Sequence, residues 1–485
     1  MSTSESPQLQ QLYINGARVS ASDGSSIPVV NPANGSTIAM VSSGSAQDID
    51  SAVQAASAAF KGEWGNAKAG DRAAALRALA AKIRENIEEL AMLECINVGK
   101  PLSSARGEVG YAAKVYEYYA GLVSNHGGLT VPVSGNGTGL TFREPLGVCG
   151  LIVPWNFPIV IMAWKLAPCL AAGNTAVVKP AEWTPLTALR VAELAVEAGI
   201  PAGVLNVVPG LGQVAGAALS AHPDVRKISF TGSTATGSAI MKACANDIKR
   251  VSLELGGKSP SIVFEDADIE KAAASVMSIY DNTGQDCCGR SRYLVARSVY
   301  SEFLERFVAN SKAVKVGDPL DAATEIGPLA SRVQYARVDG YVQQGMSEGA
   351  RLCTGGGGPS NPALAAGCYF EPTVFADVTP NMVIAQEEIF GPVVAVIPFD
   401  SEEDAIRIAN GTKYGLSASI WTRDVARALR VVRKVDSGVI SINTSSSVHL
   451  EMPFGGFKQS GIGRELGPGA LDLFTEVKSV FISGE

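Results

Sequence analysis

Two adjacent cysteines are the strongest sign of chemistry in the sequence. Cys287 and Cys288 stand in the polar, glycine-flanked segment Gly284–Arg292, whereas structural cysteines usually have apolar neighbours. Adjacent cysteines chelate a metal poorly, and no cluster of cysteines and histidines accompanies them in the sequence, so we expect no metal site. The segment predicts an exposed thiol that acts as a nucleophile.

A carboxylate is the best candidate for the base that such a thiol requires. Histidine is the usual base, but the three histidines of the chain lie in no recognisable motif. Glu254 follows an apolar, strand-like run, and Gly256–Gly257 behind it permit a tight turn. In apolar surroundings the pKa of a carboxylate is raised, which suits a base. The alternative is an exposed glutamate at a strand end with no function.

Polar or glycine-rich segments follow four successive strand-like runs. They are Val153–Pro158, Lys179–Glu182, Val208–Gly212 and Phe230–Ser233. In open α/β sheets, ligands bind beyond the carboxyl ends of the strands, so four such loops indicate one shared site. Gly232–Gly237 opens a helix whose free N–H groups suit a diphosphate, although its spacing is not the usual G-x-G-x-x-G. Lys179 and Glu182 are either a surface ion pair or a binding site for ribose hydroxyls.

The elements that must position these residues follow an α/β pattern. From residue 148, short apolar runs alternate with helix-like segments, which is typical of βαβ units and a doubly wound parallel sheet. A second alternating region starts near residue 261. We also expect helices over 48–60, 71–98, 108–123, 269–280, 299–314 and 330–348, hairpins over 13–19 and 129–145, and a last strand over 477–482.

Composition narrows the class of protein. The 485 residues are 46% hydrophobic and 18% charged, which excludes disorder and suggests about three structural units. The net charge of −7, without a basic run, argues against a nucleic-acid or membrane partner. The apolar stretch 148–172 is interrupted by prolines and Lys165, and residues 1–11 lack the features of a secretory signal. Eight cysteines without a disulfide framework favour a reduced, cytoplasmic setting.

Taken together, the motifs resemble the NAD(P)-dependent aldehyde dehydrogenase superfamily. They occur in the family's order over nearly the whole chain: PWNFP (154–158), KPAE (179–182), FTGS (230–233), LELGGKSP (253–260), GQDC (284–287), EEIFGPV (387–393) and PFGGFKQSGIGRE (453–465). The resemblance implies a Rossmann-type cofactor domain (1–128 and 146–256), an α/β catalytic domain (257–459) and a β oligomerisation arm (129–145 and 460–485).

The resemblance also implies a role for each matching residue. Cys287 takes the nucleophile position, Glu254 the general base and Asn156 the oxyanion contact, with Lys179 also in the catalytic set. The implied cofactor-binding residues are Ile152, Trp155, Lys179, Glu182, Gly210, Thr231, Gly232, Ser233, Leu255, Glu388 and Phe390. The implied substrate tunnel is lined by Tyr111, Phe157, Trp164, Asp286, Cys288 and Phe454.

The expected function is the oxidation of an aldehyde to its acid, with NAD preferred over NADP, in a homodimer or homotetramer. A CoA-acylating enzyme is one alternative, but it commonly lacks the glutamate found here at Glu254. A non-catalytic protein of the same fold is another, but it would usually have lost Cys287 or Glu254. The substrate stays open between aromatic, aliphatic and cationic aldehydes. Asp286 and the tunnel aromatics favour a cation, while Asp286 and Arg290 depart from the family pattern beside the cysteines.

Overall fold

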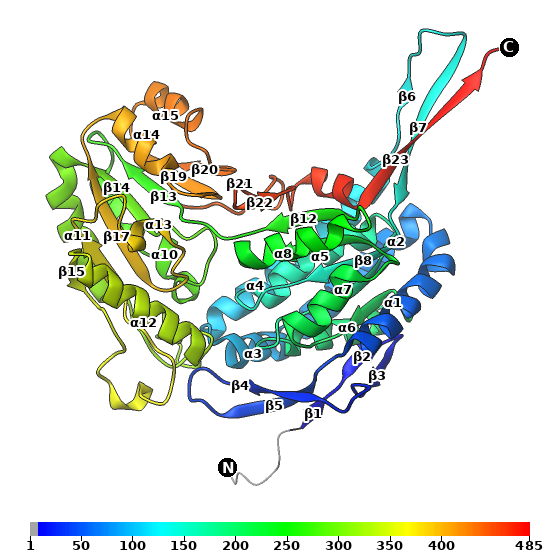
Figure 1. Cartoon of the computed structure of the whole chain (residues 1–485), viewed down its shortest axis with the longest axis horizontal. Coiled ribbons are helices and arrows are strands. Elements are labelled where there is room, and N and C mark those ends of the chain that lie inside the picture. Colours follow the sequence, from blue (N-terminus) through cyan, green and yellow to red (C-terminus); the bar gives the residue numbers. More distant parts are fainter. Residues whose placement is uncertain (1–7) are drawn as a thin grey trace.

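A computed structural model describes residues 8–485 of the chain. The expectations for the first seven residues, including the start of the cofactor domain at residue 1, lie outside the described residues. The chain forms two α/β lobes that lie side by side, and a β arm projects from the first lobe beside the C-terminus (Figure 1).

An eight-stranded sheet is the centre of the first lobe. Its strand order is β22-β12-β11-β8-β9-β10-β2-β3, and the five strands from β12 to β10 are parallel. Strands β8 and β9 are buried along their whole length, which explains why they read as continuous apolar runs. The strands are β2 (Leu12–Ile14), β3 (Ala17–Val19), β8 (Val148–Ile152), β9 (Thr175–Lys179), β10 (Leu205–Val207), β11 (Val225–Thr231), β12 (Arg250–Glu254) and β22 (Gly461–Ile462).

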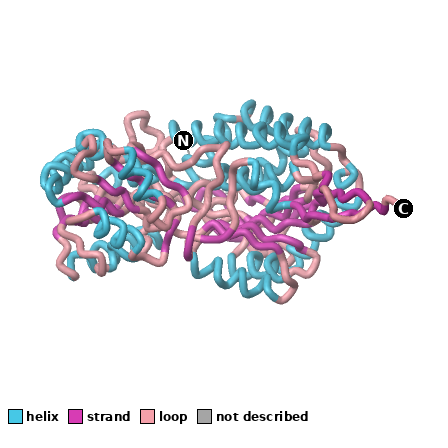
Figure 2. The backbone as a smooth tube through the Cα atoms, turned by 90° about the horizontal axis from the view of Figure 1, so that it is seen from above, coloured by secondary structure: helices cyan, strands magenta, loops and turns pink. Residues whose placement is uncertain are grey.

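Helices cover both faces of this sheet, so that it forms the middle layer of three (Figure 2). Alternate residues of β8 enter different cores: Cys149 and Leu151 pack with α2 to α6, and Val148 and Ile152 pack with α1, α7 and α8. The helices are α1 (Ala46–Lys61), α2 (Ala69–Glu85), α3 (Ile87–Val98), α4 (Leu102–Leu122), α5 (Pro158–Ala171), α6 (Leu186–Glu197), α7 (Ala217–Ala221) and α8 (Thr234–Ala245).

Two long helices expected from the sequence are interrupted. The stretch 71–98 is divided at Asn86, whose backbone leaves the helical region and whose amide donates to the carbonyl of Lys82. The stretch 269–280 is divided beside Ser275, whose hydroxyl donates to the carbonyl of Ala272. In both places a short polar side chain hydrogen-bonds to the backbone of the preceding turn, which competes with helix continuation.

The second lobe is built on a seven-stranded sheet in the order β15-β16-β17-β14-β13-β19-β20, parallel except for β15. Its strands are β13 (Pro260–Val263), β14 (Arg292–Ala296), β15 (Arg351–Thr354), β16 (Thr373–Ala376), β17 (Val393–Phe399), β19 (Ser417–Trp421) and β20 (Val439–Ile442). Its helices are α9 (Ile269–Ala274), α10 (Met277–Tyr280), α11 (Tyr300–Ala313), α12 (Arg332–Ser347), α13 (Val383–Gln386), α14 (Glu402–Asn410) and α15 (Val425–Val432).

The chain passes from the first sheet to the second in one short step. Strand β12 ends at Glu254, and β13 begins at Pro260, so the connection is the glycine-rich segment 255–259. The carboxyl end of β12 therefore lies next to the start of the second lobe. Residues 281–291, which precede β14, pack closely against this connection. A Cβ on Gly257 would overlap the carbonyl oxygen of Cys287, so only glycine fits there.

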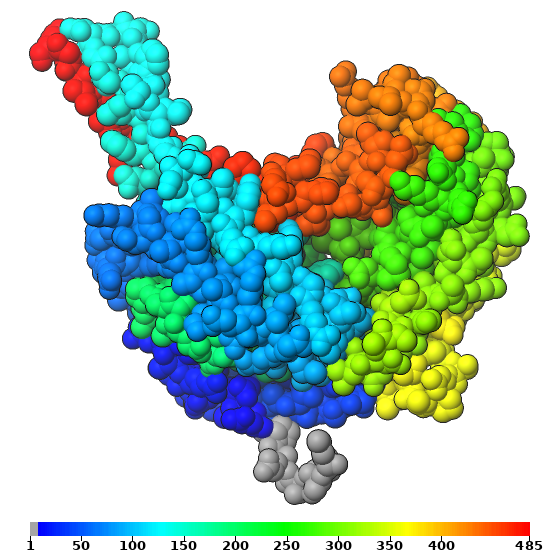
Figure 3. All heavy atoms as spheres, turned by 180° about the vertical axis from the view of Figure 1, so that it is seen from behind, coloured from blue at the N-terminus to red at the C-terminus, as the bar shows by residue number. Residues whose placement is uncertain are grey.

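The arm is a three-stranded antiparallel sheet made from two segments that lie far apart in the sequence. It consists of β6 (Thr130–Val131), β7 (Gly137–Pro145) and β23 (Thr475–Ser483), and the space-filling view shows it standing clear of the body (Figure 3). The sequence predicts a last strand over 477–482 that has no obvious partner inside either α/β domain. The structure agrees, because this strand pairs along the whole of β7 in the arm, from Thr475 opposite Pro145 to Ser483 opposite Gly137. The long antiparallel register satisfies the backbone groups of both strands.

The segment expected to belong wholly to the arm, 460–485, divides between two regions. Its first part adds β22 to the edge of the first sheet, where Gly461 lies opposite Glu254. Its next part is the 3-10 helix η7 (Pro468–Phe474), which packs on α5. Only β23 lies in the arm, because the apolar side chains of η7 enter the core of the first lobe.

Smaller elements complete the molecule. The predicted hairpin at the N-terminus is present as β2 and β3, and its Asn15-Gly16 turn has positive φ at both residues, as a type I′ turn requires. A three-stranded sheet of β1 (Leu9–Gln10), β5 (Thr37–Ser42) and β4 (Ser26–Val30) lies beside it, and β18 (Tyr414–Gly415) pairs with β21 (Phe457–Lys458). Over residues 8–485, no helix has the length and apolar character needed to cross a bilayer.

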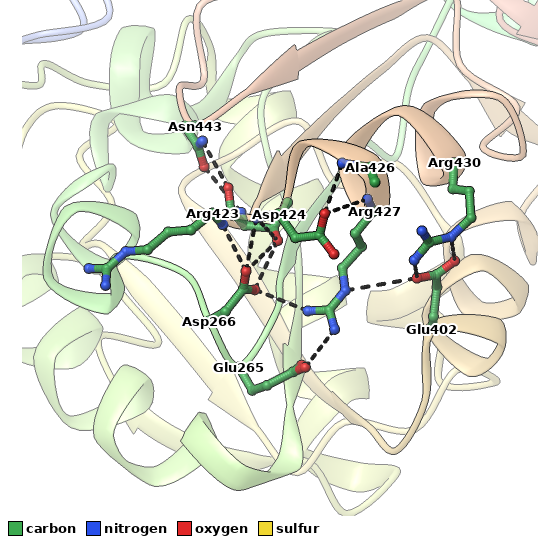
Figure 4. A network of polar contacts seen from close by, with 10 residues as sticks. Glu265, Asp266, Glu402, Arg423, Asp424, Ala426, Arg427, Arg430 and Asn443 are labelled. Atoms are coloured by element: carbon green, nitrogen blue, oxygen red, sulfur yellow. Dashed lines mark hydrogen bonds and ion pairs between the residues drawn. The ribbon is translucent and has the colours of Figure 1, made fainter.

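A polar network holds helix α15 on the second lobe (Figure 4). The carboxylate of Asp266 accepts hydrogen bonds from the hydroxyl of Thr422 and from the backbone N–H groups of Arg423 and Asp424, at 2.8–3.0 Å. The guanidinium of Arg427 donates to the same carboxylate at 3.0 Å. The wider network in Figure 4 also contains Glu265, Glu402, Arg430 and Asn443. Asp266 therefore anchors the turn that starts the helix.

Replacing this anchor should destabilise the second lobe. We expect Asp266→Ala to lower the free energy of unfolding by about 2–3 kcal/mol, since hydrogen bonds to a charged group contribute more than neutral ones. Urea unfolding of the whole chain measures the effect. The control is Arg407→Ala, which removes only an exposed pair with Asp404 and should change stability by less than ~1 kcal/mol. Equal shifts in the two variants would show that the anchor has no special role.

Candidate active site

The thiol of Cys287 and the carboxylate of Glu254 lie next to each other between the two lobes. The Sγ atom of Cys287 donates to Oε2 of Glu254 at 3.8 Å. Glu254 is 4% exposed at the end of β12, so the alternative of an exposed glutamate is ruled out. Cys287 and Cys288 are half-buried rather than fully exposed. The two residues singled out from the sequence as nucleophile and base are therefore brought together.

Burial raises the pKa of the Glu254 carboxyl well above its usual range, and the nearby charge of Glu465 raises it further. The pKa of the Cys287 thiol is also raised, first by the side chain of Cys288, then by burial and by Glu254. A charge on Glu254 thus disfavours the thiolate, whereas the hydrogen bond from the Cys287 thiol lowers the pKa of Glu254. The thiol therefore keeps its proton unless the neighbouring Glu254 carboxylate accepts it, as expected of a thiol that is activated by a general base.

Glu465 and Lys165 belong to the site, although the sequence assigned neither a role. Lys165 is fully buried in α5, where its ammonium forms an ion pair with Glu465 and donates to the hydroxyl of Ser229 at 3.3 Å. The Oε2 atom of Glu465 and the Oε1 atom of Glu254 have no hydrogen-bond partner among residues 8–485. A lysine inside an otherwise apolar helix was the signal that could have revealed this pair.

Asn156 lies in the loop between β8 and α5. Its side-chain amide donates to the carbonyl of Gln285 at 2.9 Å, which uses one of the two amide hydrogens. Its backbone carbonyl accepts from Lys100 at 3.0 Å and from Asn282 at 2.9 Å. Asn156 is 5% exposed and lines the same cavity as Cys287. An amide donor is thus held close to the thiol.

The backbone before Cys287 is held in an unusual conformation. Asn282 and Thr283 have φ of 48° and 59°, a region that a β-branched residue such as Thr283 rarely adopts. Gln285 stabilises the turn: its Nε2 donates to the carbonyl of Asn282 at 2.9 Å, and its Oε1 accepts from the N–H of Ala330 at 2.8 Å. The buried glutamine of the GQDC motif therefore fixes the segment that presents the thiol.

One cavity of about 630 Å³ joins the cysteine to most of the residues predicted from the sequence. Its lining includes the predicted residues Tyr111, Trp155, Asn156, Phe157, Trp164, Thr231, Gly232, Ser233, Leu255, Asp286, Cys287, Cys288, Glu388, Phe390 and Phe454. Five predicted residues lie outside this lining: Ile152, Lys179, Glu182, Gly210 and Glu254. Glu254 contacts the thiol of Cys287. Lys179 and Glu182 lie at the end of β9, where Nζ of Lys179 is 3.4 Å from Oε2 of Glu182.

One end of the cavity has the groups that a dinucleotide needs. The hydroxyl of Ser233 caps α8 and leaves the helix N-terminus facing the cavity. The buried hydroxyl of Thr231 has no hydrogen-bond partner within the described chain. Glu388 accepts from the N–H of Gly257 at 2.8 Å, and burial raises the pKa of its carboxyl to about 7. Phe390 has a φ of 62° and packs edge-on against Trp155, with ring centroids 5.3 Å apart.

The other end of the cavity is aromatic and acidic. The rings of Trp164 and Phe454 pack edge to face, with centroids 5.2 Å apart, and Tyr111 and Phe157 complete the aromatic walls. Asp286 accepts from the N–H and the thiol of Cys288 at 3.1 and 3.3 Å. Burial raises the pKa of Asp286 above its usual value.

The sequence did not reveal two acidic residues of the lining, and it left the role of Arg290 open. Glu108 and Asp281 also line the cavity, and neither was predicted. Glu108 precedes Tyr111 by three residues in α4, so helical spacing from Tyr111 could have found it. Arg290, which departs from the family pattern, is a buried structural residue that donates to the hydroxyl of Ser419 at 2.7 Å.

The cysteines and the acidic residues give no sign of metal binding. All eight cysteines are free. Within residues 8–485, no group of three or more His, Cys, Asp or Glu side chains is placed so that it could hold a metal ion.

Comparisons with known proteins agree with this geometry. The sequence profile described as "Aldehyde dehydrogenase family" matches residues 19–480. The cytosolic 10-formyltetrahydrofolate dehydrogenase of Xenopus tropicalis is 45% identical over 482 residues, which cover 97% of this chain and 53% of the relative. This chain thus spans about half the length of that group of curated relatives.

Two further relatives match along nearly their full length. An aldehyde dehydrogenase of Emericella nidulans is 44% identical over 471 residues, 97% of this chain and 94% of the relative. The NAD⁺ complex of an aldehyde dehydrogenase from Bacillus cereus superposes with a TM-score of 0.96 at 45% identity, covering 98% of this chain and 97% of that one. The fold is therefore shared with an aldehyde dehydrogenase whose structure contains NAD⁺.

Proposed function

The chain belongs to the aldehyde dehydrogenase family, whose general reaction is the NAD-dependent oxidation of an aldehyde to its acid, and we propose that it carries out this reaction at Cys287. The observation that supports the proposal most strongly is the contact of 3.8 Å between the thiol of Cys287 and the carboxylate of Glu254. This pair lies at one cavity that has a dinucleotide end and an aromatic, acidic end.

The first step is the attack of the Cys287 thiolate on the aldehyde carbon, which gives a tetrahedral thiohemiacetal. Because the thiol's pKa is raised, its proton has to pass to a neighbouring base, and Glu254 is the acceptor within reach. The negative charge on the former carbonyl oxygen is stabilised by the side-chain amide of Asn156 and the backbone N–H of Cys287. One such donor typically lowers the barrier by ~3 kcal/mol.

The tetrahedral carbon then loses a hydride, and a thioester remains on Cys287. NAD, when bound, supplies the carbon that accepts this hydride. Glu254 releases to solvent the proton that it took from the thiol and then removes a proton from a water molecule that attacks the thioester. The carbon–sulfur bond breaks, the acid is released, and Glu254 returns a proton to the Cys287 thiolate. Because its pKa is raised, the Glu254 carboxylate is a stronger proton acceptor than an ordinary glutamate, which suits this step.

The cofactor is NAD, and this chain has residues suited to each of its parts. Glu182 and Lys179 would hold the hydroxyls of the adenosine ribose, Ser233 and the N-terminus of α8 the diphosphate, and Glu388 the nicotinamide ribose. Ile152, Trp155, Gly210, Thr231, Gly232, Leu255 and Phe390 complete the proposed binding surface. The carboxylate of Glu182 would repel a 2′-phosphate, so we expect NADP to be used less well. Because Lys179 pairs with Glu182 at the end of β9, we assign it to cofactor binding and not to the chemistry.

Two alternative functions are less well supported. A CoA-acylating enzyme would not need a base for water, yet Glu254 is present and lies beside the thiol. A binding protein without activity would not need to keep the thiol, the carboxylate and the Asn156 amide around one cavity.

The acidic, aromatic end of the cavity favours an aldehyde that carries a positive charge. Glu108, Asp281 and Asp286 all line the cavity. Because Glu108 forms an ion pair with Lys100, Asp281 and Asp286 are the carboxyl groups offered to a cation. Aromatic faces attract cations, and a cation bound there would favour the ionised form of Asp286. An ω-amino or a quaternary ammonium aldehyde is therefore the proposed substrate class, ahead of aliphatic and aromatic aldehydes.

The arm is the proposed contact between subunits of a homodimer or a dimer of dimers. The strands of the arm and the loops beside them expose large apolar side chains, including Leu129, Val133, Phe142, Val477, Phe481 and Ile482. Apolar groups on a projecting sheet with open edges favour association with another chain. Since β23 pairs with β7 of its own chain, the whole three-stranded arm is the element offered to a neighbour. Free cysteines throughout support a reduced, cytoplasmic location.

The acyl step gives the direct test of the proposed function. We expect Glu254→Gln to reduce turnover by about 10²–10⁴-fold, because water loses its base. Mass spectrometry of this variant after mixing with aldehyde and NAD should show an acyl group on Cys287. Cys287→Ala should form no adduct and no NADH, whereas Cys288→Ala, the matched control, should keep turning over. A wild type that is strongly stimulated by free CoA and releases acyl-CoA would favour the acylating alternative.

Substrate charge can be tested with two aldehydes of equal length. For Asp286→Asn we expect kcat/KM for 3-aminopropanal to fall about tenfold, which corresponds to ~1.4 kcal/mol. For butanal, which has no charge, kcat/KM should hardly change. The ratio of the two values isolates the effect of charge from any effect on the neighbouring cysteines. An unchanged ratio would argue against recognition of a cation by Asp286.

Removal of the last strand tests the assembly. Deletion of residues 476–485 should convert the oligomer into smaller species in light scattering and should lower activity, because β7 loses its partner and the apolar face is broken. Leu429→Asp, a change at an exposed apolar residue of α15, is the control and should leave the mass unchanged. A wild type that is fully active as a monomer at micromolar concentration would contradict the proposed assembly.

A further inference from the structure

We propose that Lys100 is a positioning residue, which aims the amide of Asn156 at the reacting oxygen by holding the backbone carbonyl of Asn156. This inference rests on the function proposed above, in which Asn156 stabilises the oxyanion. The ammonium of Lys100 donates to that carbonyl at 3.0 Å, and the lysine is 2% exposed. Lys100 lies outside the cavity lining, so it acts through Asn156 and does not contact the substrate.

The local sequence turns Lys100 inward. Gly99 ends α3 with a φ of 94°, and its position is crowded by Pro328 and Pro32, so a larger residue would not fit. Pro101 precedes the first residue of α4. A lysine between a left-handed glycine and a proline has little conformational freedom. Its side chain therefore enters the protein at the junction of α3 and α4 and reaches the loop that carries Asn156.

Three groups contact the ammonium of Lys100. It forms ion pairs with Glu108 and with the fully buried Glu94, the latter at 3.9 Å. It also lies 4.5 Å from the centre of the Phe157 ring, the residue next to Asn156. A buried charge with two counter-ions and an aromatic face has one preferred position. The ammonium that donates to the carbonyl of Asn156 therefore has a fixed position.

The loop of Asn156 needs this support because it lies between two regular elements. Strand β8 ends at Ile152, and α5 begins at Pro158. The carbonyl of Asn156 is satisfied by two side chains, Lys100 and Asn282, rather than by a neighbouring strand or helix turn. Rotation of this peptide would swing the side-chain amide away from the thiol. A shift of about 1 Å is enough to weaken a preorganised site.

A double-mutant cycle tests whether Lys100 acts through Asn156. Asn156→Ala alone should lower kcat about 10²–10³-fold, as expected for loss of one oxyanion donor. Lys100→Met should lower kcat about tenfold or more in the wild type, with little change in the dissociation constant of NAD measured by fluorescence. In the Asn156→Ala background, Lys100→Met should cost almost nothing further, because the amide that it positions is gone. Lys82→Met, which affects only a surface pair with Glu85, is the control.

The outcomes distinguish the proposed oxyanion role of Asn156 from the proposed positioning role of Lys100. If Asn156→Ala leaves kcat unchanged, the oxyanion role fails and the positioning role fails with it. If Asn156→Ala is impaired but Lys100→Met costs the same factor in both backgrounds, only the positioning role is overturned, since the lysine is then merely structural. If Lys100→Met yields no folded protein, the double-mutant cycle is measured with Asn282→Gly in its place. It removes the second donor to the carbonyl while the glycine accepts the φ of 48° at that position, and non-additivity with Asn156→Ala is again the expected result.

Discussion

The close approach of three backbone segments at Gly256 and Gly257 is the constraint on which the rest of the site depends. The chain leaves the first sheet at Glu254 and enters the second at Pro260. A Cβ on Gly256 would overlap the carboxylate of Glu388, and one on Gly257 would overlap the carbonyl of Cys287. Only a connection without side chains lets Glu254, Cys287 and Glu388, the proposed base, nucleophile and cofactor contact, lie together. The two lobes therefore meet where the chemistry takes place.

Placing these groups together requires charges in an interior that disfavours them. Glu254, Glu465 and Lys165 are buried, as are Lys100 and Glu94 behind Asn156. Buried ion pairs rarely add to stability, because desolvation offsets their attraction. These buried charges set position and protonation. Burial and the charge of Glu465 raise the pKa of Glu254, and the ammonium of Lys100 donates to the carbonyl in the loop of Asn156. The large apolar cores of both lobes offset the cost.

The C-terminal segment connects the site to the arm. Glu465 lies a few residues after β22, which pairs with β12 just where Glu254 ends that strand. The segment then packs on α5 as η7 and continues into β23. A single run of about twenty residues thus supplies a charge to the active site, an edge strand to the first sheet and a strand to the arm. Association through the arm would stabilise the same segment that holds Glu465.

Much of this protein is determined by the sequence alone. Alternating apolar runs and helical segments fix the α/β class, because hydrophobic periodicity reports local structure directly. The residue types of Cys287, Glu254 and the loops at the strand ends indicate the chemistry. Short-range patterns do not, however, report which distant groups meet. The last strand pairs with β7, Lys165 forms an ion pair with Glu465, and Lys100 donates to Asn156. All three were decided by packing between segments 56 to about 340 residues apart. Such buried polar contacts depend on desolvation and on distance in space, and neither is written in the local sequence.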